Sequence, residues 1–213
     1  MATFKVGTAA AEPGTRPDGV IPVTRRPGGE PLTIPVVVVH GTGDGPTLWI
    51  DGAIHGDEPE GPLSIQKLLA ELDPKQLRGT VVAIPVLNVS AFEAQQRGNP
   101  FDGFTYDMNR IYPGRPDGYP TERVAWAHYE AMIDTADLLI AVHSGGAHSY
   151  LAQAQFYNGT DAGLELAKAM GPGWDLILKP LGSKGSPPAA MAERGKAAIT
   201  VELGGLCSTL PDD

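Results

Sequence analysis

Apolar runs of strand length recur along the chain, with turns or helical patterns between them. The runs are rich in valine, isoleucine and leucine and have no polar face, which is typical of strands buried on both sides. They occupy residues 33–40, 46–54, 79–87, 137–142 and 197–205, and shorter candidates lie at 21–24, 150–157 and 174–178. This pattern predicts a largely buried central sheet.

Helical periodicity alternates with these runs. Apolar positions recur every three or four residues in 59–72, and Asp73-Pro74 ends this pattern because the residue before a proline disfavours helical geometry. Further helices are expected at residues 121–133, 161–170 and 187–194. Strands that alternate with helices predict an α/β fold, with a mixed, mostly parallel twisted sheet and helices on both faces.

Two parts of the chain interrupt the alternation. Residues 1–32 are rich in glycine, proline and charge, so we expect an N-terminal edge segment there and one domain over 33–213. Residues 88–120 form a long polar, glycine-rich segment. A loop of this length inside a compact domain is usually functional or disordered.

Composition narrows the choice of partner and compartment. The 213 residues suit one domain, and the net charge of −9 argues against nucleic acid, which needs a basic face. The only cysteine, Cys207, excludes a disulfide within the chain and fits a reducing compartment. The first residues lack the apolar core of a signal peptide, and no run is long enough to cross a membrane. We therefore expect a cytoplasmic protein that binds neither nucleic acid nor membrane.

Histidine and glutamate residues follow two of the predicted strands. His55 and Glu58 follow the run 46–54, and His143 follows the run 137–142. If these strands are parallel neighbours, the two segments share one edge of the sheet. Two histidines and a glutamate are ordinary zinc ligands, and a catalytic zinc commonly takes three protein ligands. The pair His55 and Glu58 alone is a weak signal, since a carboxylate at a helix start also favours the helix dipole.

Glu202 is the unusual residue of the last apolar run. An unpaired charge inside an apolar strand is costly, so it is either ion-paired, exposed at the strand end, or a general base. Asp57 and Glu60 are interpreted as charges at a helix start, and His40 as a structural residue with metal binding as a minor alternative.

Taken in chain order, four motifs resemble the zinc carboxypeptidase superfamily, and most closely its succinylglutamate desuccinylase/aspartoacylase branch. The motifs are His55-Gly-Asp-Glu58, Asp107-Met-Asn109-Arg110, His143-Ser-Gly-Gly and Val201-Glu202-Leu-Gly-Gly. The similarity covers roughly residues 34–206. It implies an α/β fold of the zinc-peptidase (phosphorylase/hydrolase-like) type, with residues 33–213 as the zinc-hydrolase catalytic domain.

The resemblance also implies roles. His55, Glu58 and His143 would hold one Zn²⁺ per chain, and Glu202 would take a proton from water and pass it to the leaving amine. Asn109 and Arg110 would bind a substrate carboxylate, Arg97 would stabilise the oxyanion, and Asp107 would orient a ligand imidazole. The implied activity is zinc-dependent hydrolysis of the amide bond in a small N-acyl amino acid that carries a carboxylate. A homo-oligomer is a separate expectation for this chain.

Two departures from the family pattern leave alternatives open. Ala141 stands where the branch commonly has an aspartate, two residues before the third ligand. Members usually continue into a carboxy-terminal β-rich domain, whereas this sequence stops at Asp213, so we expect that domain to be absent here. The alternatives are a zinc metallocarboxypeptidase acting on short peptides and a catalytically inactive binding relative. Serine or cysteine acyl transfer would require sensitivity to alkylating reagents instead.

Overall fold

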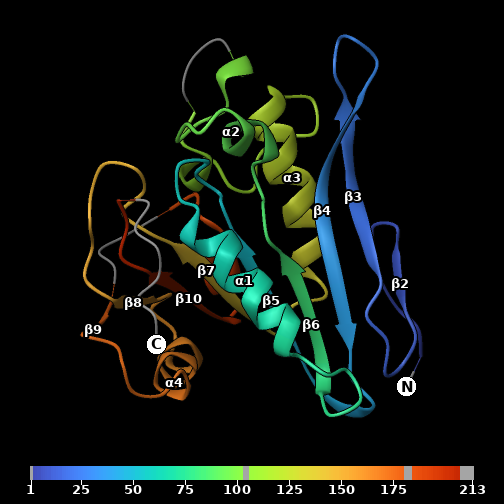
Figure 1. Cartoon of the computed structure of the whole chain (residues 1–213), viewed down its shortest axis with the longest axis vertical. Helices are drawn as coiled ribbons and strands as arrows, with labels where there is room; N and C mark the ends of the chain where they lie inside the picture. Colours follow the sequence, from blue (N-terminus) through green and yellow to red (C-terminus); the bar gives the residue numbers. More distant parts are fainter. Residues whose placement is uncertain (1, 103–105, 180–183, 207–213) are drawn as a thin grey trace.

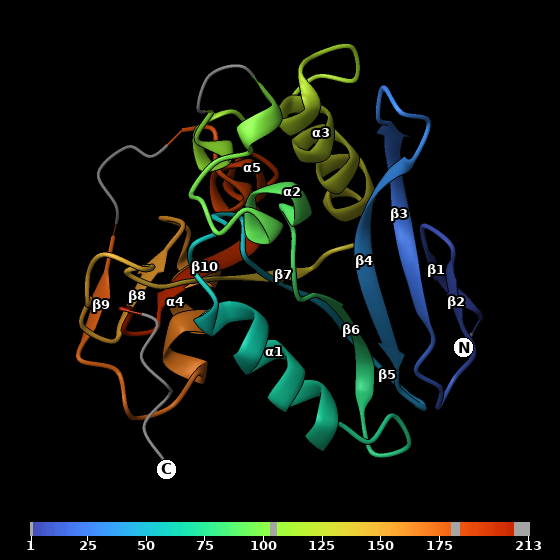
Figure 2. The same cartoon turned by 45° about the horizontal axis from the view of Figure 1, so that its top comes forward.

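The computed structural model describes residues 2–102, 106–179 and 184–206 (Figure 1). Eight of the strands in this part of the chain form one sheet, in the order β3-β4-β6-β5-β7-β10-β8-β9. Their bounds are β3 Asp18–Arg25, β4 Pro31–His40, β5 Gly43–Gly52, β6 Arg78–Ile84, β7 Leu138–His143, β8 Ala154–Tyr157, β9 Leu176–Leu178 and β10 Ala197–Glu202. A hairpin of β1 (Phe4–Val6) and β2 (Ala9–Ala11) lies beside β3 and β4 (Figure 2).

The centre of the sheet is parallel. β6, β5, β7 and β10 run in one direction as neighbours, while β4 and β8 run the opposite way on their two sides. The carboxyl ends of β5, β7 and β10 therefore meet at one edge, which is where ligands bind in open α/β sheets. The predicted mixed, mostly parallel sheet is confirmed.

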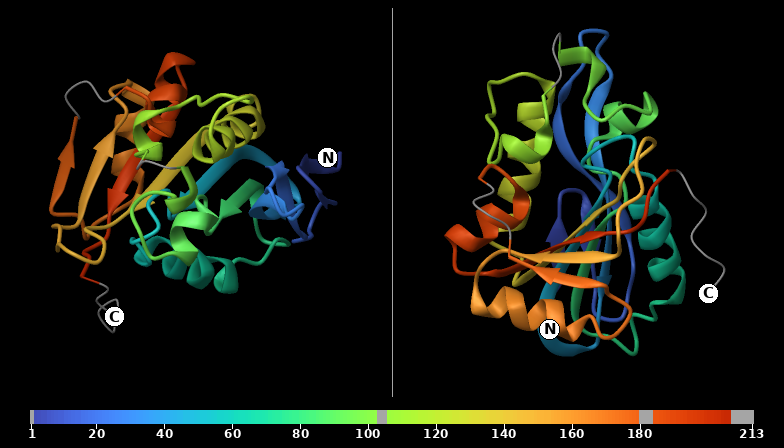
Figure 3. Two further views of the ribbon diagram at one scale, coloured as in Figure 1. Left: turned by 90° about the horizontal axis from the view of Figure 1, so that it is seen from above. Right: turned by 90° about the vertical axis from the view of Figure 1, so that its left-hand side faces the viewer.

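Helices cover both faces of this sheet (Figures 2 and 3). The helices are α1 Glu60–Glu71, α2 Val89–Glu93, α3 Pro120–Ile133, α4 Asp161–Ala169 and α5 Pro187–Glu193. α1 and α4 pack on one face through Ile65 and Ala167, in a cluster that includes Ile140 and Val201. α3 and α5 pack on the other face. No described helix is long and apolar enough to cross a membrane.

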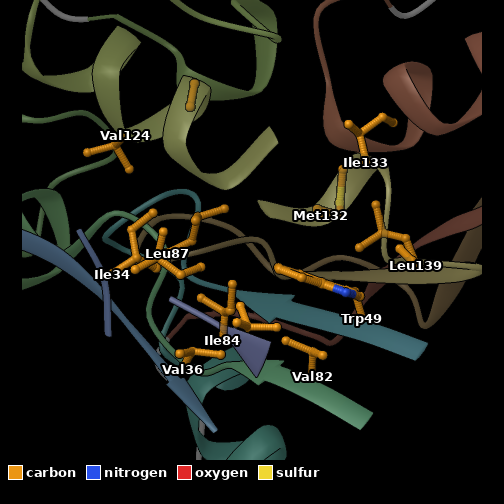
Figure 4. Close-up of a cluster of buried hydrophobic side chains, with 14 of the residues drawn as sticks. Ile34, Val36, Trp49, Val82, Ile84, Leu87, Val124, Met132, Ile133 and Leu139 are labelled. Carbon is orange, nitrogen blue, oxygen red and sulfur yellow. The ribbon is translucent and has the colours of Figure 1, made fainter. Parts of the chain in front are cut away.

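The core under α3 is built around Trp49 of β5 (Figure 4). The indole is fully buried between strand residues such as Val82 and Leu139 and the helix residue Met132. These residues come from β5, β6, β7 and α3, so their burial holds the parallel strands and the covering helix together.

Several predicted boundaries shift by a few residues. β5 ends at Gly52 rather than 54, because Ala53 has a φ of 49° and turns the chain out of the strand. β10 ends at Glu202 rather than 205, since Gly204 and Gly205 both adopt positive φ. β8 begins at Ala154, and Tyr150 makes only an isolated bridge to Gly205.

The N-terminal segment forms more sheet than expected. The predicted strand at 21–24 is part of the eight-residue strand β3, which pairs with β4 along most of its length. Pro22 is compatible with this position because β3 pairs on one side only and needs no amide donor on the other. The division at residue 32 stays a prediction, and Cys207 lies outside the described residues.

Residues 88–120 are organised into short helices where the structure describes them. α2 is followed by the 3-10 turns Pro100–Asp102 and Met108–Arg110. Asp102 accepts hydrogen bonds from the amide (3.2 Å) and the hydroxyl of Thr121 at the start of α3, and the amide of Tyr112 donates to Gly185 O at 2.9 Å. The segment is therefore anchored to both α3 and the loop before α5.

Candidate active site

The three ligand-type residues His55, Glu58 and His143, together with Glu202, lie at the carboxyl edge of the neighbouring strands β5, β7 and β10. Gly52 of β5 pairs in register with Val142 of β7, and His143 of β7 pairs in register with Glu202 of β10. His55 follows Gly52 by three residues, so the register alone brings these segments to one place.

The turn after β5 is held in a constrained conformation. Ala53 is buried with a φ of 49°, an uncommon conformation for a residue with a side chain, and such strain is found preferentially at functional sites. Gly56 packs so closely on α2 that a Cβ there would lie 2.0 Å from the carbonyl carbon of Ala91. The turn therefore requires glycine at position 56. It also directs the side chains of His55 and Glu58 inward, where both are almost fully buried.

His55, Glu58 and His143 form one cluster. Glu58 Oε1 lies 2.6 Å from His55 Nδ1, and Glu58 Oε2 lies 3.0 Å from His143 Nδ1. The imidazole rings are 5.0 Å apart between centroids, and one ligand atom from each residue lies within 4.8 Å of the others. The histidines expected to meet from separate strands do meet.

The charges of the cluster are coupled. Burial acts to raise the pKa of Glu58, but hydrogen bonds from His143 and His55 outweigh it and lower the pKa to about 2. Burial also disfavours the charged form of His55, yet its hydrogen bonds to Asp107 and Glu58 raise its pKa overall. Glu58 is thus held as a carboxylate, the form that binds a cation.

Asp107 and Arg97 extend the cluster outward. Asp107 Oδ1 accepts from His55 Nε2 at 2.9 Å, which leaves Nδ1 of the same ring directed at Glu58. Arg97, about half exposed, lies 3.1 Å from Asp107 and 3.5 Å from Glu58. Hydrogen bonds from His55 and the charges of His55 and Arg97 keep the pKa of Asp107 low despite partial burial.

Glu60 has a role that the sequence did not indicate. It lies in the first turn of α1, as expected, but it is buried, and its Oε2 accepts from Ser144 Oγ at 2.6 Å. The backbone amide of Ser144 also donates a hydrogen bond to Glu58 Oε2 at 3.3 Å. Glu60 therefore ties the loop after His143 to the helix that follows Glu58. The sequence alone does not indicate this link, because a glutamate at a helix start is common. It is visible only in the contact between Glu60 and Ser144, which are distant in the chain.

Glu202 stands beside the cluster without a hydrogen-bond partner among the described residues at its buried Oε2. Burial raises its pKa to about 7, although the nearby His143 acts in the opposite direction. A carboxyl group with a pKa near neutrality, beside a cluster that can hold a cation, is suited to accept and release a proton.

A cavity of about 550 Å³ is lined by Glu202 and by Asn109 and Arg110, the pair predicted to bind a carboxylate. Phe156, Pro188 and Ala192 give it an apolar wall. The amide of Asn109 donates to Asp107 Oδ1 at 2.9 Å, so the pair is fixed to the residue that also holds His55. The three ligand-type residues do not line this cavity, and Glu202 connects it to them.

A buried polar group lies behind the site and was not predicted. His128 of α3 lies 3.5 Å from Asp51 and 2.8 Å from the hydroxyl of Tyr112. Burial raises the pKa of Asp51 to about 7 and lowers that of His128 to about 3. Asp51 of β5 pairs in register with Ala141 of β7. In the family pattern an aspartate stands at the position of Ala141, and here the carboxyl group of Asp51 lies beside that position on the adjacent strand.

His40 lies away from this edge. It pairs with Thr80 at the start of β6, and its ring nitrogens lie 2.8 Å from Thr80 Oγ1 and 3.1 Å from Ala2 O. The single grouping of potential metal ligands within the described chain is His55, Glu58 and His143.

The donor set fits a catalytic zinc. Two imidazole nitrogens and one carboxylate, buried and convergent, are the number and type of ligands that such an ion takes from a protein. The hydrogen bond from His55 Nε2 to Asp107 fixes the ring as ligating histidines are usually fixed. The cluster can therefore hold a divalent metal ion.

Known proteins show similarity over most of the chain. A model of the succinylglutamate desuccinylase/aspartoacylase catalytic domain matches residues 44–213. The N-alpha-acetyl-L-2,4-diaminobutyric acid deacetylase of Halomonas elongata is 34% identical over 187 residues, which make up 85% of this chain and 54% of that protein.

Solved structures agree with this result. The product-bound ectoine utilization protein EutE (DoeB) from Ruegeria pomeroyi has a TM-score of 0.80 and 31% identity, covering 91% of this chain and 61% of that one. An aspartoacylase family protein from Mesorhizobium loti has a TM-score of 0.82 and 27% identity, covering 100% and 68%. The chain thus spans about half the length of the curated relative that it matches.

Proposed function

The chain belongs to the succinylglutamate desuccinylase/aspartoacylase family, and on that premise we propose that it is a zinc-dependent deacylase of a small N-acyl amino acid. The observation that carries the proposal is the convergence of His55, Glu58 and His143 beside Glu202, whose buried Oε2 has no hydrogen-bond partner in the described part of the chain. The single cysteine further supports the cytoplasm as the place where it works.

His55, Glu58 and His143 would hold the zinc ion. When bound, zinc supplies Lewis acidity, which polarises a carbonyl oxygen and lowers the pKa of water to about 7. The chain's own contribution is to keep Glu58 ionised and to fix His55 through Asp107.

Glu202 is proposed to move the proton. Its buried Oε2 would accept a proton from the attacking water and later donate it to the departing nitrogen of the amide. A carboxyl group with a pKa near 7 can do both at neutral pH, because neither protonation state is strongly favoured.

Arg110 and Asn109 are proposed to bind the substrate carboxylate. Both face the 550 Å³ cavity that Glu202 borders, so an amino acid lying there would present its amide towards Glu202. The guanidinium fork matches a planar carboxylate. Arg97, next to Glu58, is proposed to stabilise the oxyanion that forms when water attacks.

An assay of the zinc-loaded chain tests the proposal. N-acetyl-L-2,4-diaminobutyrate, N-succinylglutamate and N-acetylaspartate would be compared with short peptides that have a free carboxyl terminus. We expect release of amine from an acyl amino acid, loss of activity with a chelator and its recovery with zinc. Cleavage of the peptides alone would favour a carboxypeptidase, and stoichiometric zinc without turnover of any substrate would favour a binding relative.

Arg110→Ala should raise KM for the acyl amino acid while changing zinc content little. A hydrogen bond to a charged group contributes about 1.5–3 kcal/mol, which corresponds to a loss of roughly 10- to 150-fold in kcat/KM. Arg115→Ala is a matched control, because Arg115 is also exposed but pairs with Asp117. An unchanged KM in Arg110→Ala would contradict the assigned role.

Asp107→Asn should weaken zinc binding by about 10- to 100-fold, as expected for a carboxylate that orients a ligating histidine. Competition with a chromophoric chelator measures the change directly. Asp117→Asn, an exposed substitution of the same chemistry, should leave the affinity unaltered. Equal affinity in both variants would remove Asp107 from the support of His55.

A further inference from the structure

Tyr112 joins two loops that line the cavity. It follows Arg110 by two residues, and its amide donates a hydrogen bond to Gly185 O at 2.9 Å. Gly185 has a φ of 76°, and a Cβ atom there would overlap the carbonyl oxygen of Arg110, so the two loops are in backbone contact. Lys184 and Ser186, on either side of Gly185, line the same cavity as Arg110. The position of Tyr112 therefore affects both of these walls.

The segment that carries Asn109 and Arg110 is held at both ends. At one end Asp107 accepts a hydrogen bond from the amide of Asn109 at 2.9 Å. At the other end the ring of Tyr112 is buried, and its hydroxyl lies 2.8 Å from Nδ1 of His128 in α3. The predicted carboxylate-binding pair thus lies between an anchor at the ligand-type cluster and an anchor in the core.

The hydrogen bond between Tyr112 and His128 has a defined direction. Burial raises the pKa of Tyr112 well above its usual value and lowers the pKa of His128 to about 3. The phenol therefore keeps its proton, and the imidazole is neutral, with one nitrogen as donor and the other as acceptor. Tyr112 donates to Nδ1, which leaves the proton of His128 on Nε2.

The second nitrogen of His128 lies near Asp51 of β5. Nε2 and Asp51 Oδ2 are 3.5 Å apart, and neither atom has another polar partner in the part of the chain that the structure describes. β5 also leads into the turn that holds His55. The series Tyr112, His128 and Asp51 therefore connects the cavity wall to the strand that places His55.

This series is polar although it lies in an apolar region. His128 is fully buried and packs edge-on against Trp49, with ring centroids 5.6 Å apart, in the core under α3. Burying polar groups is costly unless they are hydrogen-bonded, and a satisfied network holds a core in one arrangement. Apolar side chains of similar size would fill the same space without a directional bond to the cavity loop.

We propose that Tyr112 is a positioning residue, which holds the carboxylate-binding pair at one distance from Glu202. The inference rests on the proposed function, in which this pair binds the substrate carboxylate and Glu202 serves the amide. A fixed distance selects substrates whose acylated nitrogen and carboxylate are attached to the same carbon. A substrate with one more carbon between the two groups cannot place both of them correctly, and small misplacements are costly in rate.

Two isomeric probes test this selection. One carbon separates the amide nitrogen from the carboxylate in N-acetyl-L-alanine, and two carbons separate them in N-acetyl-β-alanine. We expect the zinc-loaded wild type to favour the first probe. Tyr112→Phe removes a single oxygen atom, and it should lower kcat/KM for that probe by up to about 100-fold, mostly through KM, and narrow the preference. Its zinc stoichiometry should stay at the wild-type value.

Tyr129→Phe is the matched control. Tyr129 follows His128 on α3, and its hydroxyl accepts a hydrogen bond from the exposed Arg194 at 3.3 Å rather than from the cavity loop. This variant should keep both the rate and the preference of the wild type. An unchanged preference in Tyr112→Phe, or an equal loss in Tyr129→Phe, would overturn the proposal.

A double-mutant cycle separates positioning from a general structural role. If Tyr112 acts through Arg110, Tyr112→Phe should change kcat/KM little in an Arg110→Ala background, so that the two losses are not additive. Additive losses would overturn the proposal. His128→Asn keeps an acceptor oxygen near the position of Nδ1 and should retain most of the preference, whereas His128→Leu should behave like Tyr112→Phe.

Hydrogen exchange distinguishes failure of this proposal from failure of the proposed function. The amide at position 112 is bonded to Gly185 O, and Tyr112→Phe should speed its exchange about 2- to 10-fold, with or without zinc. Tyr129→Phe should leave it unchanged. A wild type that hydrolyses neither probe, with faster exchange in Tyr112→Phe, would refute the proposed function and support the anchor. Unchanged exchange in Tyr112→Phe would overturn the anchor whatever the activity.

Discussion

Glu202→Gln is expected to remove turnover while zinc stays bound at the wild-type stoichiometry. Glutamine keeps the size and hydrogen-bonding ability of the side chain but cannot accept a proton from water. General acid–base catalysis contributes about 10²- to 10⁴-fold, so kcat should fall by that factor with little change in KM. Single-turnover kinetics together with metal analysis measure the two quantities.

The same substitution should stabilise the zinc-free protein at alkaline pH. The pKa of Glu202 is raised from 4.5 to about 7, so the folded protein holds this proton more tightly than the unfolded chain does. Stability from this group is therefore present below pH 4.5 and lost as pH rises through 7. Because Glu202 is partly solvated, we expect Glu202→Gln to gain only about 1–2 kcal/mol at pH 8.

Denaturant unfolding at pH 5 and pH 8 tests this point. Above pH 7 the variant should be the more stable protein, and the difference should shrink towards pH 5. Retained turnover would refute Glu202 as the base. A variant that is inactive and less stable at pH 8 would show that Glu202 is a structural residue.

His143→Ala is expected to lose the zinc ion. The imidazole is one of the three proposed ligands and lies 3.0 Å from Glu58, so its removal would leave only His55 and Glu58 to bind the ion. The affinity should fall by more than the about 10- to 100-fold expected for a residue that merely orients a ligand. Activity should disappear at zinc concentrations that saturate the wild type.

His148→Ala provides the control for this experiment. His148 belongs to the loop that follows the same strand, but it is exposed and stands outside the ligand cluster. It should keep both zinc and activity. Circular dichroism of both variants separates loss of metal from loss of fold, and stoichiometric zinc in a folded His143→Ala would exclude His143 as a ligand.

The strands were predictable because buried strands consist of continuous apolar residues. The run 137–142 and the strand Leu138–His143 differ by one residue at each end. Strand ends were less predictable, since they depend on backbone angles such as the φ of 49° at Ala53 that apolar periodicity does not specify. β9 is short and exposed, so the sequence indicated only an extended segment.

The clustering of His55, Glu58 and His143 was predictable from the sequence, because these residues follow two apolar strands in motifs of distinct composition. Glu60 and the group of Asp51, His128 and Tyr112 were not accessible in this way. Their roles depend on contacts between residues far apart in the chain, such as Glu60 with Ser144 and His128 with Tyr112. A helical histidine or a glutamate at a helix start has no sequence signature that separates these roles from ordinary ones.

Crystals of the zinc-loaded chain, measured on both sides of the zinc absorption edge, would show directly whether the cluster holds the ion. We expect one strong anomalous peak per chain, bounded by His55, Glu58 and His143 and adjacent to Glu202. A peak elsewhere, or no peak at this cluster when zinc is present in excess, would contradict it.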